Sequence, residues 1–206
     1  MTETQARLYY VHDPMCSWCW GYKPTLEALE SSLPSSIEMV YLLGGLAPDS
    51  ALAMPDDMQQ FLQQTWHKIN AQLGTEFNHD FWQVNTPRRS TYPANRAVLA
   101  AEKQGAGKAM IKQIQNAYYL QAINPSDLNN LLVLAEKLGL DKKTFVEDIS
   151  SEALNELLMQ QIQFARSLPI QGFPSLILAV GASYYPVQLD YKHAQVSLEH
   201  VAELLA

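Results

Sequence analysis

The chain has 206 residues, of which 48% are hydrophobic and 17% are charged, and its formal net charge is −7 at pH 7. This length and composition predict a soluble globular protein with a complete apolar core. The acidic balance argues against nucleic acid or an anionic membrane as the main partner, and no apolar segment approaches the roughly 20 residues of a transmembrane helix.

The N-terminal part of the chain predicts a strand, a helix and a second strand. Residues 8–11 form a short aromatic and β-branched segment that ends at Asp13-Pro14, which is typical of a buried strand before a turn. Leucines recur at helical spacing over residues 16–32, and residues 37–43 have the pattern of a strand. Since parallel strands need a crossover connection, we expect this helix to join them.

The middle of the chain, from about residue 56 to residue 168, contains almost only amphipathic helical patterns. We interpret its aromatic and methionine positions, such as Phe61 and Trp66, as helical core. Six helices are predicted here, around residues 58–73, 94–101, 111–120, 128–138, 141–149 and 151–165.

Strand character returns at residues 174–180 and 184–187, with a turn at Gly181-Ala182 between them. Residues 196–205 then predict a final amphipathic helix. The predicted order is therefore β-α-β, a helical block, and β-β-α.

The two cysteines, Cys16 and Cys19, lie three positions apart where the first predicted strand gives way to a helix. Free N–H groups and the dipole at a helix N-terminus stabilise a thiolate. Cys16 is therefore the expected nucleophile, and Cys19, one turn later, is expected to resolve a mixed disulfide. For Asp13, which precedes Pro14, the preferred interpretation is a plain turn residue, and the alternative interpretation is a proton relay.

Two further interpretations of the cysteine pair are a zinc site and inert core thiols. Zinc needs two more ligands, usually a second Cys/His pair at short spacing, whereas the five histidines are scattered, so we expect no metal.

Residues 1–7 lack a basic start and the apolar run that follows is short, which argues against a signal peptide and favours a cytoplasmic location. In that compartment a Cys-x-x-Cys pair is more often catalytic than structural.

Two motifs separated by the helical block give the chain its resemblance to a known family. One is Cys16-Ser17-Trp18-Cys19 after a strand, and the other is Gly172-Phe173-Pro174 before a strand. The chain resembles the DsbA family of thiol-disulfide oxidoreductases, and within it the FrnE-like cytoplasmic branch, which commonly has proline at the Ser17 position.

The resemblance implies an α/β, thioredoxin-like fold interrupted by an all-helical insertion. Residues 1–55 and 169–206 would form the thioredoxin-like domain, and residues 56–168 the inserted helical domain. Residues 93–97 resemble a stretch that packs an insertion helix near the active site in this branch, although an ordinary alanine-rich packed helix is the preferred interpretation.

The resemblance also implies roles for individual residues. Pro174 would be a cis proline facing the cysteines, and Phe173 would offer its backbone to an extended substrate, with Trp18 as a further substrate-binding residue. Related enzymes often have a buried carboxylate six positions before the first cysteine, but this chain has Tyr10 there. The redox-active disulfide would need no cofactor, with glutathione as a candidate co-substrate.

The expected function is thiol-disulfide exchange with protein, peptide or small-thiol partners. One alternative is a glutathione-dependent isomerase or transferase similar to the kappa-type glutathione transferases, which typically carry serine at the position of Cys16. A second alternative is a peptide-binding or chaperone module whose thiols are incidental.

Overall fold

The computed structural model of the chain describes residues 6–206. Residues 1–5 lie outside the described residues. They belong to the segment that was expected not to be a signal peptide and to the expected thioredoxin-like domain. None of the described helices combines the length and the apolar character that crossing a membrane requires.

One four-stranded sheet organises the two ends of the chain. The spatial order of its strands is β2-β1-β3-β4. The β1 and β2 strands are parallel and are joined by α1 (Ser17–Ser32), while β3 is antiparallel to both β1 and β4. The predicted β-α-β and β-β-α ends are thus confirmed. The strands are β1 (Ala6–His12), β2 (Ile37–Leu43), β3 (Ser175–Val180) and β4 (Ser183–Val187).

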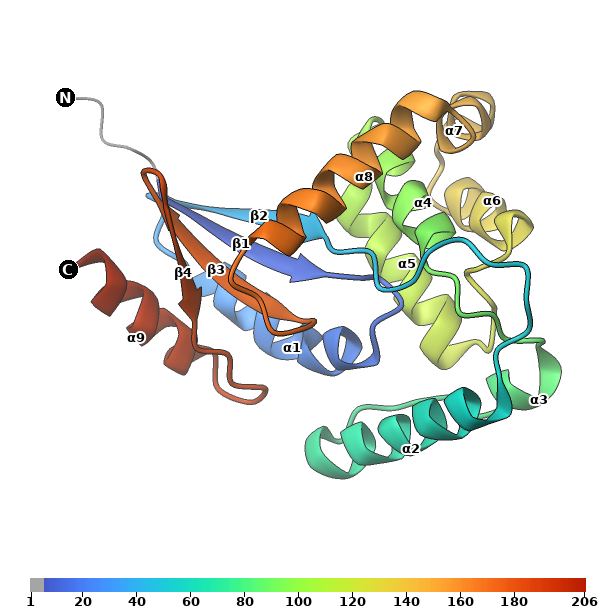
Figure 1. Ribbon diagram of the computed structural model, residues 1–206, viewed down its shortest axis with the longest axis horizontal. Helices are drawn as coiled ribbons and strands as arrows, with labels where there is room; N and C mark the ends of the chain where they lie inside the picture. The colour runs from blue at the N-terminus through green and yellow to red at the C-terminus, as the bar shows by residue number, and fades with distance from the viewer. Residues whose placement is uncertain (1–5) are drawn as a thin grey trace.

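Alternate residues of β1 face two different helical layers, as the two-residue period of a strand requires. Leu8 and Tyr10 are buried in one apolar cluster with α1 and the C-terminal helix α9 (Ala194–Leu205). Val11 is buried in another cluster that contains Ala165 of α8 (Glu152–Ser167). The sheet is therefore covered on both faces, with α1 and α9 against one face and α8 against the other (Figure 1).

Between β2 and β3 the chain forms helices only, and most of them gather at one end of the sheet (Figure 1). The predicted helices are all present, and α7 and α8 begin where expected because Asp141 and Ser151 cap their first turns. The structure adds α3, which is too short to produce a periodic pattern. The remaining helices of this block are α2 (Asp56–Leu73), α3 (Phe81–Val84), α4 (Tyr92–Glu102), α5 (Gly107–Leu120), α6 (Leu128–Lys137) and α7 (Lys142–Ile149).

The helical block packs onto the end of the sheet that carries the cysteines. Its apolar cluster includes Met15 and Leu43, which belong to the sheet-forming part of the chain. Trp66 of α2 is fully buried, and its indole N–H donates a hydrogen bond of 2.9 Å to the hydroxyl of Ser17. This contact places α2 beside the start of α1.

The domain boundaries expected at residues 55/56 and 168/169 stay a prediction.

Phe61 is an exception to the expected helical core. Its side chain is 60% exposed, although it shares a helix with the buried Trp66. The interpretation of Phe61 as core was wrong because α2 packs through one face only, and Phe61 lies on the rim of a pocket instead.

Candidate active site

Cys16 is the N-cap residue of α1. Its backbone is extended, and its sulfur accepts a hydrogen bond of 3.3 Å from the N–H of Cys19. The turn before it is closed by a hydrogen bond of 3.0 Å from the Cys16 N–H to the Asp13 carbonyl. Both thiols are free, and only Cys16 lines the pocket described below. The Cys16 sulfur therefore faces the pocket, whereas the Cys19 sulfur does not.

The second motif lies directly against Cys16. The Phe173–Pro174 peptide bond is cis, and the Cys16 thiol donates a hydrogen bond of 3.6 Å to the Phe173 carbonyl oxygen. The Phe173 ring packs on Gly44, where an added Cβ would lie 2.1 Å from the ring. Pro174 borders a separate cavity with Phe173 and does not line the pocket in front of Cys16.

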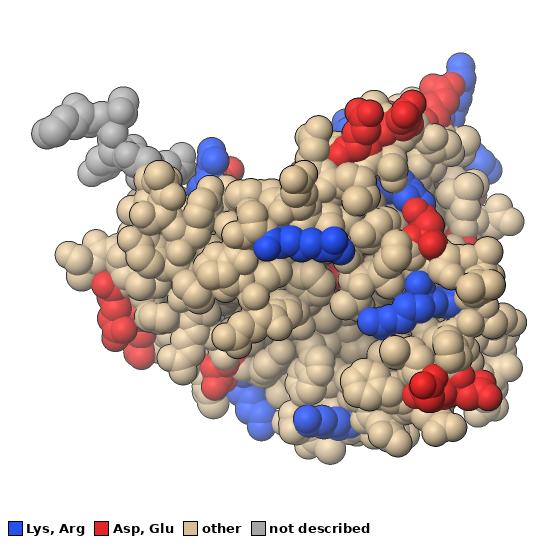
Figure 2. Space-filling view, viewed as in Figure 1, with Lys and Arg blue, Asp and Glu red and all other residues tan. Residues whose placement is uncertain are grey.

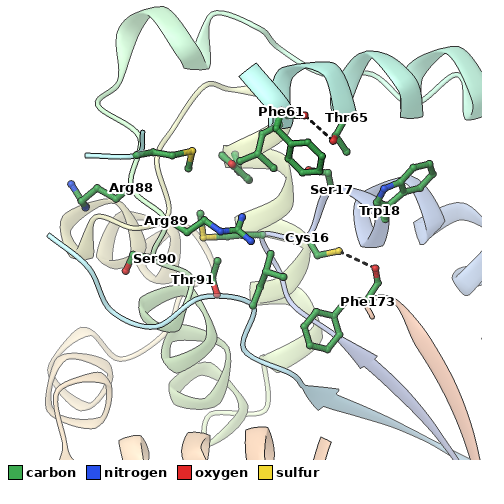
Figure 3. A pocket seen from close by; sticks show the side chains of 15 residues that line it. Cys16, Ser17, Trp18, Phe61, Thr65, Arg88, Arg89, Ser90, Thr91 and Phe173 are labelled. Atoms are coloured by element: carbon green, nitrogen blue, oxygen red, sulfur yellow. Dashed lines mark hydrogen bonds between the residues drawn. The ribbon is translucent and has the colours of Figure 1, made fainter. Parts of the chain in front are cut away.

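A pocket of about 190 Å³ opens in front of Cys16 (Figure 3). It lies between the start of α1, the helix α2, the loop before α4 and the Phe173 loop. One wall is apolar, and the loop before α4 supplies two arginines. Among its lining residues are Met15, Cys16, Trp18, Leu46, Met54, Phe61, Leu62, Thr65, Arg88, Arg89, Thr91, Tyr118 and Phe173.

Trp18 lies at the edge of this pocket, as Figure 3 shows. Its ring centroid is 5.1 Å from that of Tyr191, and the ammonium of Lys68 is 5.8 Å from the Trp18 centroid. The ring is thus held from two sides and remains partly exposed. Substrate binding by Trp18 and by Phe173 stays a prediction.

Asp13 is completely buried and joins three segments of the chain. One carboxylate oxygen accepts a hydrogen bond of 2.8 Å from the Met15 N–H. The other accepts hydrogen bonds from the Leu46 N–H at 2.7 Å, the Thr91 hydroxyl at 2.7 Å and the Asn95 amide at 2.9 Å. Burial raises the pKa of the Asp13 carboxyl, and these hydrogen bonds act in the opposite direction.

This network gives Asp13 a larger structural role than that of a plain turn residue. Thr91 and Asn95 come from the start of α4, so Asp13 connects the cysteine loop to the helical block. Within residues 6–206, no side-chain hydrogen bond of Asp13 involves a thiol. The proton-relay role of Asp13 stays a prediction. The resemblance of residues 93–97 to a stretch near the active site pointed toward Asn95. No sequence signal identified Thr91, because 78 residues separate it from Asp13.

Cys19 is fully buried behind Cys16. Burial raises the pKa of the Cys19 thiol well above its ordinary value, and the neighbouring Cys16 raises it further. Tyr10, at the position where related enzymes often have a carboxylate, lines the same small cavity as Cys19. Burial raises the pKa of Tyr10, and the two cysteines add to the effect. Tyr10 therefore places a protonated hydroxyl near the second thiol.

His12 precedes the cysteine loop and is also fully buried. Burial lowers the pKa of His12 to about 3, so the imidazole is neutral at pH 7. Its ring stacks on Tyr10 with a centroid distance of 4.8 Å, and neither ring nitrogen has a hydrogen-bond partner in the described part of the chain. No group of three or more metal-ligating side chains is found within residues 6–206.

Comparison with known proteins supports the thioredoxin-like fold. A family model described as thioredoxin matches residues 9–184. The cytosolic disulfide reductase DsbM from Pseudomonas aeruginosa superposes with a TM-score of 0.78 and 25% identity, covering 97% of this chain and all of that one. A crystal structure of a candidate protein disulfide isomerase from Nitrosomonas europaea gives a TM-score of 0.86 at 23% identity, covering 98% of each chain.

Curated relatives carry a different kind of name. The ClpXP adapter protein SpxH of Bacillus subtilis is 27% identical over 195 residues, which cover 85% of this chain and 64% of the relative. The chain thus spans less than two thirds of that protein's length. Since the family model covers most of the chain and the solved structures share its arrangement of sheet and helices, the chain belongs to the thioredoxin family.

Proposed function

We propose that this protein is a thiol-disulfide oxidoreductase in which Cys16 attacks and Cys19 resolves. One observation carries the proposal. The Cys16 sulfur caps α1, faces a pocket and lies 3.6 Å from the Phe173 carbonyl oxygen, so a substrate sulfur in the pocket would meet a positioned nucleophile. The Cys19 N–H and the helix dipole stabilise negative charge on that sulfur.

The reaction proceeds in two exchange steps. The Cys16 thiolate attacks one substrate sulfur, so a mixed disulfide forms, the substrate disulfide breaks, and a thiolate leaves. Cys19 then loses its proton and attacks the Cys16 sulfur, which forms the intramolecular disulfide and releases the second substrate thiolate, which takes up a proton. The substrate gains two electrons, and the cysteine pair loses two. Two equivalents of a small thiol would reduce the pair again.

The comparisons favour the reducing direction and a small-thiol partner. DsbM is named as a cytosolic disulfide reductase, and a structure of it with GSH has 23% identity to this chain and a TM-score of 0.76. We infer a cytoplasmic protein that reduces protein, peptide or small disulfides, with glutathione as co-substrate. A paired thiol suits exchange better than the serine of the kappa-type glutathione transferases.

A role as an adaptor protein is the second candidate. The observation in its favour is the 27% identity to the ClpXP adapter protein SpxH across most of this chain. An adaptor binds its partner through a surface and needs no thiol chemistry, so the double variant Cys16→Ser, Cys19→Ser would retain that role. The oxidoreductase role would be lost in the same variant.

The two single cysteine variants test the oxidoreductase and control for each other. Reduced wild-type protein should reduce insulin disulfides and bis(2-hydroxyethyl) disulfide, whereas Cys16→Ser should be inactive. Cys19→Ser should accumulate a mixed disulfide on Cys16, detectable by mass spectrometry after acid quenching. Activity that survives in Cys16→Ser would overturn the proposal.

A further inference from the structure

We propose that the pocket in front of Cys16 selects small disulfides that carry a carboxylate close to the sulfur, and that Arg89 binds this carboxylate. The inference rests on the proposed function and deepens it by naming the substrate class. The lining contains Arg88 and Arg89 and no aspartate or glutamate, although the whole chain has a formal net charge of −7.

The face of the molecule in Figure 2 offers no general explanation for this local positive charge. On the face shown in Figure 2, lysine and arginine side chains are separated by uncharged surface and form no continuous basic stripe. The two adjacent arginines are therefore a local feature of the pocket.

The two arginines differ in their partners. The Arg88 guanidinium forms an ion pair with Asp127 at the start of α6, and this carboxylate neutralises its charge. Among residues 6–206, no hydrogen bond or ion pair involves the side chain of Arg89. In Figure 3 the Arg89 side chain extends toward Cys16, whereas Arg88 points away from it. Arg89 thus keeps an unneutralised guanidinium inside the pocket that holds the nucleophile.

The backbone on both sides of Arg89 is held in place. The Met54 N–H donates a hydrogen bond of 2.8 Å to the Pro87 carbonyl, and Ala53 and Arg88 form an isolated β-bridge. On the other side, the Ser126 hydroxyl donates a hydrogen bond of 2.7 Å to the Ser90 carbonyl. Because the loop is fixed at both neighbours, the Arg89 backbone needs no ordering when a ligand binds, which lowers the cost of binding.

A carboxylate is the ligand group that fits this arrangement. A guanidinium offers N–H donors in a planar fork that matches carboxylate geometry, and a half-buried site screens the attraction less than open water does. The apolar wall formed by Phe61 and Leu62 suits the methylene groups between a carboxylate and a sulfur. The volume of about 190 Å³ favours a small disulfide.

The experiment compares three disulfides of similar size and different charge. They are 3,3′-dithiodipropionate, which is anionic, bis(2-hydroxyethyl) disulfide, which is neutral, and cystamine, which is cationic. Reduced protein is mixed with each, and its oxidation is followed in a single turnover by tryptophan fluorescence. This design needs no added reductant that would itself attack the disulfide.

We expect wild-type protein to react with the anionic disulfide about 10- to 100-fold faster, in second-order rate constant, than with the neutral one, and slowest with cystamine. Arg89→Ala should remove most of that ratio, while Arg89→Lys should keep part of it. The control Arg166→Ala changes an exposed arginine of α8 and should leave the ratio unchanged. Added salt should reduce the wild-type ratio.

The ratio separates this inference from the proposed function. If wild-type protein reacts with none of the three disulfides and also leaves insulin disulfides unreduced, the oxidoreductase itself is disproved. If it reduces the neutral disulfide but shows no preference for the anionic one, or if Arg89→Ala keeps the preference, only the carboxylate site is disproved. A ratio that falls equally in Arg166→Ala would attribute the preference to overall charge and would also overturn the inference.

Discussion

The Cys16 sulfur lies 3.6 Å from the carbonyl oxygen of Phe173, which is 157 residues further along the chain. This contact joins the start of α1 to the loop before β3, and it exists because β3 pairs with β1 in the sheet. The nucleophile and the backbone that would meet an extended substrate are therefore brought together by strand pairing. The inserted helices then close the pocket around them.

Gly44→Ala should disturb this contact from the opposite side. An alanine Cβ at this position would lie 2.1 Å from the Phe173 ring, so the ring and its loop must move. We expect an exchange rate at least tenfold lower and a loss of about 1–3 kcal/mol in the free energy of unfolding. Stopped-flow oxidation and urea denaturation measure these changes. Gly107→Ala, at the start of α5, should not alter the rate, and an unaltered rate in Gly44→Ala would contradict the prediction.

Asp13→Ala should lower stability more than it lowers the activity of the folded protein. The change leaves the Leu46 N–H, the Thr91 hydroxyl and the Asn95 amide without their carboxylate, at a cost of about 3 kcal/mol in the free energy of unfolding. Urea denaturation checks this value, with exposed Asp80→Ala as a control that should lie near wild type. A large loss of rate in fully folded Asp13→Ala protein would instead support the proton-relay role.

His12→Phe should weaken the dependence of stability on acid pH. The pKa of His12 is about 3 in the folded protein and about 6.5 when the chain is unfolded. Between these values the unfolded chain binds more protons, so the free energy of unfolding falls by about 1.4 kcal/mol for each pH unit below 6.5. Burial raises the Asp13 pKa and opposes part of this slope, but both proteins share that contribution.

The measurement compares urea denaturation at pH 6.5 and pH 4.5. His12→Phe should lose about 2.5 kcal/mol less than wild type over this interval. Tyr185→Phe changes an exposed residue of β4 and should retain the wild-type dependence. Equal losses in His12→Phe and wild type would show that His12 is not held neutral by burial.

Tyr10→Phe should slow the second exchange step. The hydroxyl of Tyr10 is protonated at neutral pH and lies near Cys19, whose buried thiol must lose a proton to attack. A hydrogen bond to a developing thiolate favours that loss, so we expect resolution about tenfold slower and an unchanged first step. Rapid acid quenching and mass spectrometry of the mixed disulfide separate the two steps. Tyr185→Phe, on the exposed part of β4, is the matched control.

The sequence by itself determined the local features of this protein. Strand alternation, helical spacing and the capping residues Asp141 and Ser151 act over a few residues, so they were readable without a structure. The same holds for Cys16 and Cys19, because a strand followed by a helix start is enough to place one thiol at a helix N-terminus.

Tertiary packing decided the rest of the site. The Asp13 network, the pocket position of Arg89 and the exposure of Phe61 each depend on how the helical block packs against the cysteine loop. Asp13 meets Thr91 and Asn95 there across separations of 78 and 82 residues, and no local pattern encodes such a meeting. The physical reason is that periodicity reports which face of an element is apolar, while its partner is chosen only when all elements bury their faces together.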